Sequence, residues 1–126
     1  MNSLNSILLE GNLVRDPSTT STSKGTTITS FTIAVDRFYR TAESEDYQKD
    51  VSFFDVETWS SLAERCADQL HKGRGVRVVG RLQQNRWTDA AGRPHSCVKI
   101  VAEHVEFRRP QRELEIENAD SADAAE

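Results

Sequence analysis

Residues 51–82, VSFFDVETWSSLAERCADQLHKGRGVRVVGRL, decide the fold, because the hydrophobic period of this stretch changes twice. Residues 51–58 alternate with the period of two that is typical of a half-buried strand. Residues 61–71 change to the spacing of an amphipathic helix, and from residue 76 the period of two returns. The stretch therefore predicts a strand, one helix of about residues 61–71, and a second strand that runs on to Trp87.

The expected helix has signals at both ends. Ser61 and Glu64 have the spacing of a capping box, and Gly73 is expected to close the helix. The apolar positions spaced by four residues are Leu62, Cys66 and Leu70.

Three further segments are expected to be strands. Residues 6–14 begin with a short apolar run, and Gly11 inside them indicates a bulge or a close backbone approach. Residues 27–36 alternate with period two. Residues 96–107 form the last strand, which is expected to pair back as a hairpin through the turn at residues 89–92.

The remaining segments have no such period. Residues 18–27 are almost all serine and threonine and are interpreted as a polar loop, and residues 40–50 as an exposed excursion. The element order is then β-β-β-α-β-β, which predicts an all-β OB-fold, a five-stranded Greek-key barrel with one helix between strands three and four. We expect this domain to span residues 1–110, and residues 111–126 to be a short, disordered, acidic tail.

Composition limits the possible compartments. The 126 residues are 37% hydrophobic and 29% charged, without a run of eighteen apolar residues, so no membrane association is expected. The start of the chain lacks a signal-peptide pattern. The two cysteines, Cys66 and Cys97, are too far apart for a disulfide framework or a metal box. A cytoplasmic protein is therefore expected.

Charge is unevenly distributed, although the net charge is only −4. Residues 72–93 contain six basic residues and one acidic residue, whereas residues 111–126 contain six acidic residues and one arginine. The basic segment makes an anionic partner possible despite the acidic average.

Signals for catalysis are absent from the sequence. His71 and His104 are isolated, and His95 and Cys97 lack a third ligand at metal-binding spacing. Residues 73–75, Gly-Arg-Gly, follow a helix and enter a strand, the reverse of the order in a dinucleotide-binding loop. No catalytic residue, metal or cofactor is expected.

The aromatic residues are more informative. Tyr39 and Trp87 stand at expected strand ends, next to Arg40 and Arg86 respectively. A nucleobase needs a flat π surface and its phosphate needs a cation, so this pattern favours single-stranded nucleic acid, whose base faces are free.

With these residues in view, the sequence resembles the bacterial single-stranded DNA-binding protein family over nearly all of residues 4–108. The resemblance implies an OB-fold and a homotetramer that wraps single-stranded DNA, acts in replication, recombination and repair, and catalyses no reaction. The motifs that carry it are ILLEGNLVRDP at 7–17, FTIAV at 31–35, WSSLAE at 59–64, LHKG at 70–73 and VVGRLQQNRWTD at 78–89.

The resemblance also implies which residues contact DNA. Four aromatic residues stand at positions where the family stacks bases, although three of them have changed identity. The expected stacking residues are Tyr39, Phe53, Trp59 and Trp87, and the expected phosphate contacts are Arg40, Lys72, Arg77, Arg81 and Arg86.

Two features depart from the family pattern. The resemblance implies replication and repair proteins as possible partners, but the chain ends at residues 123–126, Asp-Ala-Ala-Glu, without the Pro-Phe tip that docks them in relatives, which puts recruitment through that tip in doubt. In addition, strand alternation aims the carboxylates of Asp55 and Glu57 to the same face as Phe53, where they would repel phosphate unless they turn aside.

Two alternative functions stay open. The first is a protein-interaction module of the same fold that touches DNA weakly, which the near-neutral charge of residues 1–110 favours. The second is a nuclease, for which Asp55 and Glu57 are the candidate metal-binding carboxylates.

Overall fold

We describe the fold from a computed structural model, which describes residues 1–43 and 45–108. The expected acidic tail, residues 111–126, lies outside the described residues, and the expected domain limit at residue 110 stays a prediction. Within the described part, no helix is long and apolar enough to cross a membrane.

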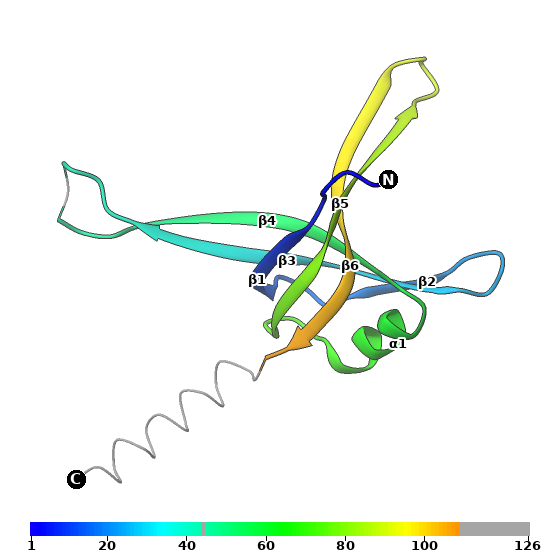
Figure 1. The fold of residues 1–126 in the computed structure, drawn as a ribbon, viewed down its shortest axis with the longest axis horizontal. Helices are drawn as coiled ribbons and strands as arrows, with labels where there is room; N and C mark the ends of the chain where they lie inside the picture. The colour runs from blue at the N-terminus through cyan, green and yellow to red at the C-terminus, as the bar shows by residue number, and fades with distance from the viewer. Residues whose placement is uncertain (44, 109–126) are drawn as a thin grey trace, which may run out of the picture.

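Five strands close into a barrel, and a sixth, short strand extends it (Figure 1). In chain order the elements are β1 (Ile7–Leu13), β2 (Ser18–Ser21), β3 (Thr27–Tyr39), β4 (Gln48–Trp59), α1 (Ser60–Gln69), β5 (Gly75–Thr88) and β6 (Pro94–Phe107). Strand β1 pairs with both β5 and β3, and β4 pairs in parallel with β6. The expected five-stranded barrel, with one helix between its third and fourth strands, is confirmed.

Strand β2 corrects the interpretation of residues 18–27 as a polar loop. Residues 18–21 pair with residues 27–30 of β3, and the hydroxyls of Thr19 and Thr29 lie 3.2 Å apart. All four side chains of β2 are exposed, so this strand has no alternation of polar and apolar residues to reveal it.

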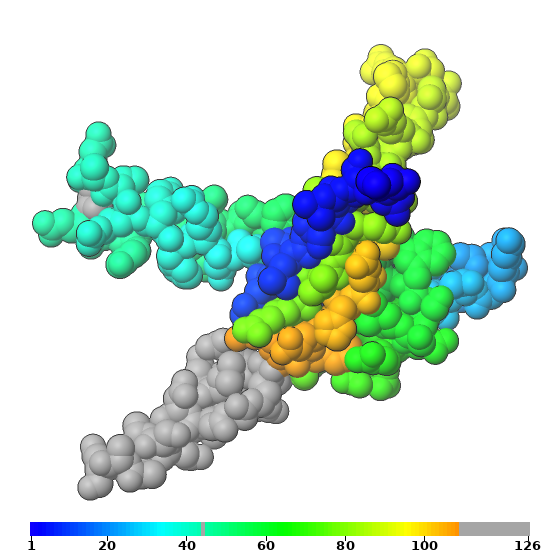
Figure 2. All heavy atoms as spheres, viewed as in Figure 1, coloured from blue at the N-terminus to red at the C-terminus, as the bar shows by residue number. Residues whose placement is uncertain are grey.

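The β3–β4 and β5–β6 hairpins extend beyond the barrel as long arms, and the short β2–β3 hairpin projects on another side (Figures 1 and 2). The β3–β4 arm is longer than expected, because β3 continues to Tyr39, which pairs with Gln48. The expected excursion over residues 40–50 is correspondingly shorter. The β5–β6 arm ends in the expected turn, where the N–H groups of Asp89 and Gly92 donate to the carbonyl oxygens of Arg93 and Asp89.

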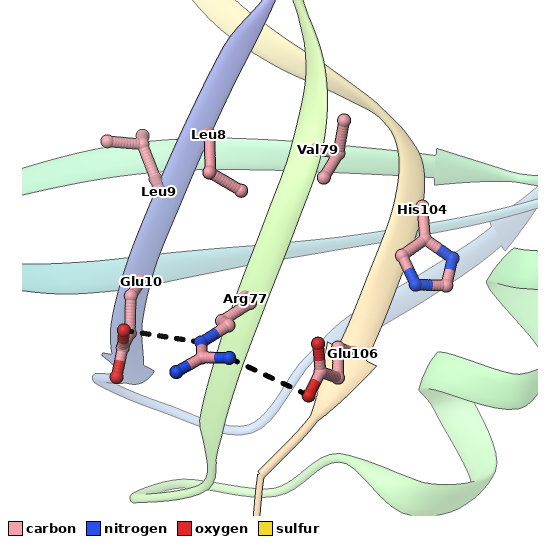
Figure 3. Close-up of a pocket in the computed structure, with 7 residues that line it drawn as sticks. All are labelled: Leu8, Leu9, Glu10, Arg77, Val79, His104 and Glu106. Carbon is pink, nitrogen blue, oxygen red and sulfur yellow. Dashed lines mark hydrogen bonds and ion pairs between the residues drawn. The ribbon is translucent and has the colours of Figure 1, made fainter.

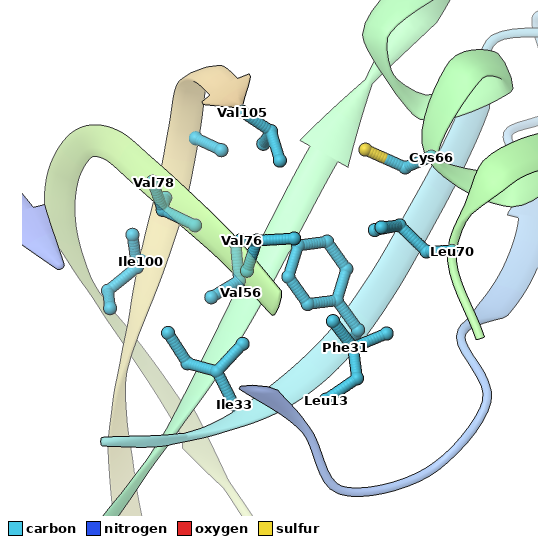
Figure 4. Close-up of a cluster of buried hydrophobic side chains, with 11 residues drawn as sticks. Leu13, Phe31, Ile33, Val56, Cys66, Leu70, Val76, Val78, Ile100 and Val105 are labelled. Carbon is cyan, nitrogen blue, oxygen red and sulfur yellow. The ribbon is translucent and has the colours of Figure 1, made fainter. Parts of the chain in front are cut away.

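The core fills the barrel and continues under α1 (Figure 4). Its buried side chains are Leu13, Phe31, Ile33, Val56, Cys66, Leu70, Val76, Val78, Ile100, Ala102 and Val105. Burial raises the pKa of the Cys66 thiol to about 11, so Cys66 stays protonated at neutral pH and acts as a small apolar residue. Cys97 is exposed on β6.

The start and end of α1 differ from the expected helix. The capping box at Ser61 and Glu64 is wrong: Trp59 occupies the N-cap position, without a side-chain cap hydrogen bond in the described residues. The chain turns directly from β4 into the helix at Ser60, whose φ is 60°. The helix ends at Gln69, so Gly73, with φ of 90°, belongs to the following turn.

Two glycines allow strands to approach closely. A Cβ on Gly11 would lie 2.5 Å from the carbonyl oxygen of Ala34, so of the two expectations for Gly11 the close backbone approach is confirmed, and the neighbour is β3. A Cβ on Gly80 would overlap the carbonyl oxygen of Val101, beside the irregular register of β5 and β6. Backbone atoms form both contacts, so neither can yield by a side-chain rotation.

We expect Gly11→Ala to lower the free energy of unfolding by about 1–3 kcal/mol, because β1 and β3 must separate to admit the methyl group. Urea denaturation of the variant and its parent measures the loss. Ser52→Ala, an exposed substitution on β4, is the control and should stay within about 0.5 kcal/mol of the parent. Equal stability of Gly11→Ala and its parent would contradict the close approach.

Candidate nucleic-acid interface

Three of the expected stacking residues share the outer face of the sheet formed by β4, β6 and β5. Buried Val56 fixes the inward positions of β4, so Phe53 and Trp59 point outward. Trp87 reaches the same face through the pairing of β4 with β6 and of β6 with β5. The exposed fractions of Phe53, Trp59 and Trp87 are 63%, 42% and 50%.

Tyr39, the fourth expected stacking residue, lies on the opposite face of the β3–β4 arm. Phe53 pairs with Ala34, so the even-numbered residues of β3 share its face, whereas Tyr39 is odd-numbered. The Arg37 guanidinium lies 5.0 Å from the centre of the Tyr39 ring. The structure therefore does not bring Tyr39 together with the other three aromatic residues.

Phe38 is an aromatic residue on the Phe53 face that the sequence-based site omitted. It is 63% exposed, and the Nζ atom of its cross-strand partner Lys49 lies 6.0 Å from the ring centre. The sequence contains the signal for Phe38: the apolar residues Phe31 and Ile33 mark the inward positions of the strand, so alternation sends the even-numbered residues outward.

The two carboxylates on this face have local partners. Thr32 Oγ1 donates to Asp55 Oδ1 at 2.7 Å and accepts from an Arg15 guanidinium nitrogen at 3.1 Å. Glu57 Oε2 accepts from Lys99 Nζ at 2.7 Å, and Glu57 Oε1 accepts from Trp59 Nε1 at 2.6 Å. Glu57 thus fixes the indole of Trp59, and Lys99 balances its charge, so the expected repulsion of phosphate is reduced.

A metal-dependent reaction gains no support from this geometry. Within residues 1–43 and 45–108, no group of three or more histidine, cysteine, aspartate or glutamate side chains is arranged to hold a metal ion.

Two of the expected phosphate contacts lie beside the exposed tryptophans. Arg81 lines a hollow on the outer face together with Trp59 and Gln83. Arg86 lines a second hollow with Trp87 near the end of the β5–β6 arm, and its guanidinium donates to Gln84 Oε1 at 3.0 and 3.2 Å.

The other three basic residues are dispersed. Arg40 follows the end of β3, and Lys72 lies in the turn after α1, where its backbone N–H donates to Asp16 Oδ1 at 2.8 Å. Arg77 lies between two carboxylates at the far end of β5 from Trp87, 3.3 Å from Glu10 and 3.9 Å from Glu106 (Figure 3). Its charge is therefore balanced within the chain.

The fold and this outer face define a class of OB-fold nucleic-acid-binding proteins, and comparison with known proteins identifies the family. A solved structure described as "Plasmodium falciparum SSB complex with ssDNA" superposes with a TM-score of 0.79 at 21% identity, covering 86% of this chain and 98% of that chain. The model of the single-strand binding protein family matches residues 4–108. The chain belongs to the single-strand binding protein family.

Curated relatives agree with this assignment. A single-stranded DNA-binding protein of Thermotoga maritima is 40% identical over 129 residues, covering 95% of this chain and 91% of the relative. One from Caldanaerobacter subterraneus is 39% identical over 108 residues, covering 86% of this chain and 70% of the relative.

We expect Lys99→Met to lower the free energy of unfolding by about 1–3 kcal/mol, because it leaves the Glu57 carboxylate, only 15% exposed, without its cation. Urea denaturation measures the change, and adding Glu57→Gln should recover part of it. Lys49→Met is the matched control: Lys49 and Asp36 are exposed and 3.9 Å apart, so about 0.5 kcal/mol or less is expected. Equal losses at Lys99 and Lys49 would contradict this role of Lys99.

Proposed function

We propose that this protein binds single-stranded DNA without sequence preference, by stacking bases on aromatic side chains and by contacting phosphates with basic ones. The observation that carries the proposal is the placement of Phe53, Trp59 and Trp87, each partly exposed, on one outer face. Family membership supports the same conclusion, and it makes the protein a DNA-binding protein rather than an enzyme.

Stacking explains why sequence would matter little. Every base has a π face, and base–aromatic stacking contributes about 1–3 kcal/mol per base. In a duplex these faces are covered by neighbouring base pairs, so the same surface discriminates against double-stranded DNA. The exposed part of an aromatic ring adds no hydrophobic stabilisation to the folded protein. Several such rings on one face of a sheet are therefore candidates for binding a ligand.

The remaining contacts extend this path. Arg81 and Arg86 lie beside the two tryptophans and are the first candidates to contact phosphate. Arg40 and Lys72 would add contacts farther along the strand, whereas Arg77 would contact phosphate only by leaving Glu10 and Glu106. Tyr39 would stack a base on the reverse face of the β3–β4 arm, so a strand that reaches both Phe53 and Tyr39 has to pass around that arm.

The cellular role that follows is protection of single-stranded DNA during replication, recombination and repair. We place the protein on the nucleoid in the cytoplasm, where such DNA arises in bacteria.

We also propose that the protein assembles as a homotetramer. An apolar surface supports self-association: Leu8, which is 71% exposed, lies beside Val79 and His104 on the outer face of β1, β5 and β6 (Figure 3). Among the described strand pairings, residues 7–11 of β1 are hydrogen-bonded to β5 and leave their other edge unpaired. An unpaired edge next to an apolar surface is a site for pairing with another chain.

Light scattering at micromolar concentration should give the mass of four chains. We expect Leu8→Glu to shift the mass toward smaller species, because it places a carboxylate in the apolar contact. A monomeric parent protein would contradict the assembly.

DNA binding is tested by tryptophan fluorescence during titration with oligo(dT) and with a duplex of equal length. Trp59 and Trp87 are the two tryptophans of the chain, so we expect saturable quenching by oligo(dT) and little response to duplex. With about five phosphates contacted, the log–log salt slope should be about −3.5.

Phe53→Ala should weaken binding about 5- to 150-fold without removing a tryptophan. Val98→Ala, an exposed position on the other face of β6, is the control and should bind like the parent. No quenching at low salt would contradict the proposal and would favour the protein-interaction module.

A further inference from the structure

The end of the β5–β6 arm contains a stacked pair of rings from opposite strands. Trp87 on β5 and His95 on β6 are direct cross-strand partners. Their ring centres lie 5.5 Å apart, and their planes differ by 17°. Because the imidazole is stacked against the indole, one side of the Trp87 ring is in contact with protein, while half of the side chain stays exposed to solvent.

His95 is itself held by the turn that joins the two strands. Its Nε2 atom lies 2.7 Å from Asp89 Oδ2. The other carboxylate oxygen, Asp89 Oδ1, accepts the backbone N–H groups of Ala91 and Arg93, both at 2.9 Å. The hydrogen bond from His95, followed by that from Arg93, lowers the pKa of the Asp89 carboxyl group, so Asp89 is an anion at neutral pH. The contacts thus run from the turn to Asp89, from Asp89 to His95 and from His95 to Trp87.

This chain of contacts fixes an otherwise exposed aromatic side chain. A free indole at the end of an arm samples several rotamers and loses that freedom when a base stacks on it. An indole already held against a second ring has lost this freedom in the folded protein, so the base meets a prepared surface. Preorganisation of this kind raises affinity without adding a contact to the ligand.

We propose that His95 is a positioning residue for single-stranded DNA binding, which holds the Trp87 indole in the orientation that accepts a base on its open face. Asp89 fixes His95 for this role. The inference rests on the proposed function, in which Trp87 stacks a base, and adds a residue that neither the aromatic pattern nor the family resemblance pointed to.

The test measures binding of a fluorescently labelled oligo(dT) by anisotropy of the label, so that removing a tryptophan does not remove the signal. We expect His95→Ala to weaken binding about 3- to 10-fold. His95→Phe keeps a ring against the indole and should bind within about twofold of the parent. His95 is exposed and outside the core, and the thermal midpoint of each variant checks that the barrel is intact.

A double-mutant cycle separates positioning from a direct contact between His95 and DNA. If His95 acts through Trp87, then His95→Ala has little further effect once Trp87→Ala is present. Equal, additive losses in both backgrounds would overturn the proposal, because His95 would then act independently of Trp87.

A spectroscopic readout tests the same claim without DNA. In a Trp59→Phe background, Trp87 is the remaining tryptophan, and its emission anisotropy should fall in His95→Ala and return in His95→Phe. Unchanged anisotropy in His95→Ala would overturn the positioning role.

The two proposals can fail separately. If Trp87→Ala binds oligo(dT) like the parent, then Trp87 is not a stacking residue, and the proposed function fails at this site. If Trp87→Ala weakens binding while His95→Ala does not, the proposed function stands and the positioning role of His95 fails.

Discussion

Closing the barrel requires β1 to change partners within seven residues, from β5 along most of its length to β3 at Asn12 and Leu13. At this crossing the two backbones approach so closely that residue 11 has no room for a Cβ, and Gly80 meets the same limit where β5 crosses β6. A barrel without these approaches would open along one edge and expose the apolar interior. This closure determines which residues of each strand face inward. It also determines the position of α1 under the barrel and the projection of the two long arms.

The candidate site consists of what closure leaves outside. Alternation sends Val56 and Thr58 inward and therefore sends Phe53, Asp55 and Glu57 outward, so aromatic rings and carboxylates share one face. Local partners reduce the conflict between stacking bases and repelling phosphates. Thr32 engages Asp55, Lys99 pairs with Glu57, and Glu57 uses its second oxygen to hold Trp59. Glu57 then orients an aromatic side chain, and its charge is balanced by Lys99, whereas Asp55 is held by a neutral hydroxyl.

Sequence patterns predicted the elements that have one buried face. The strands of the barrel and the helix each carry an apolar period, and the change of period between residues 58 and 76 located the helix. Strand β2 and the outer ends of the β3–β4 arm have no buried face, so no alternation marked them. The helix start was also invisible, because β4 turns directly into α1 at Ser60 without a side-chain cap among the described residues.

For the site, residue type could be predicted but placement could not. The family resemblance selected Tyr39, whereas register puts Phe38 on the same face as Phe53 and turns Tyr39 to the other face. In the sequence His95 is notable only for its spacing from Cys97, whereas its contact with Trp87 depends on cross-strand register, which spacing alone does not reveal.

The most direct measurement of the central claim is photo-crosslinking of an oligonucleotide that carries 5-iododeoxyuridine, with the crosslinked residues mapped by mass spectrometry. If the outer face of β4, β6 and β5 binds single-stranded DNA, crosslinks will concentrate at Phe53, Trp59 and Trp87. Crosslinks confined to the surface around Leu8 and His104, with these three residues unmodified, would contradict the account.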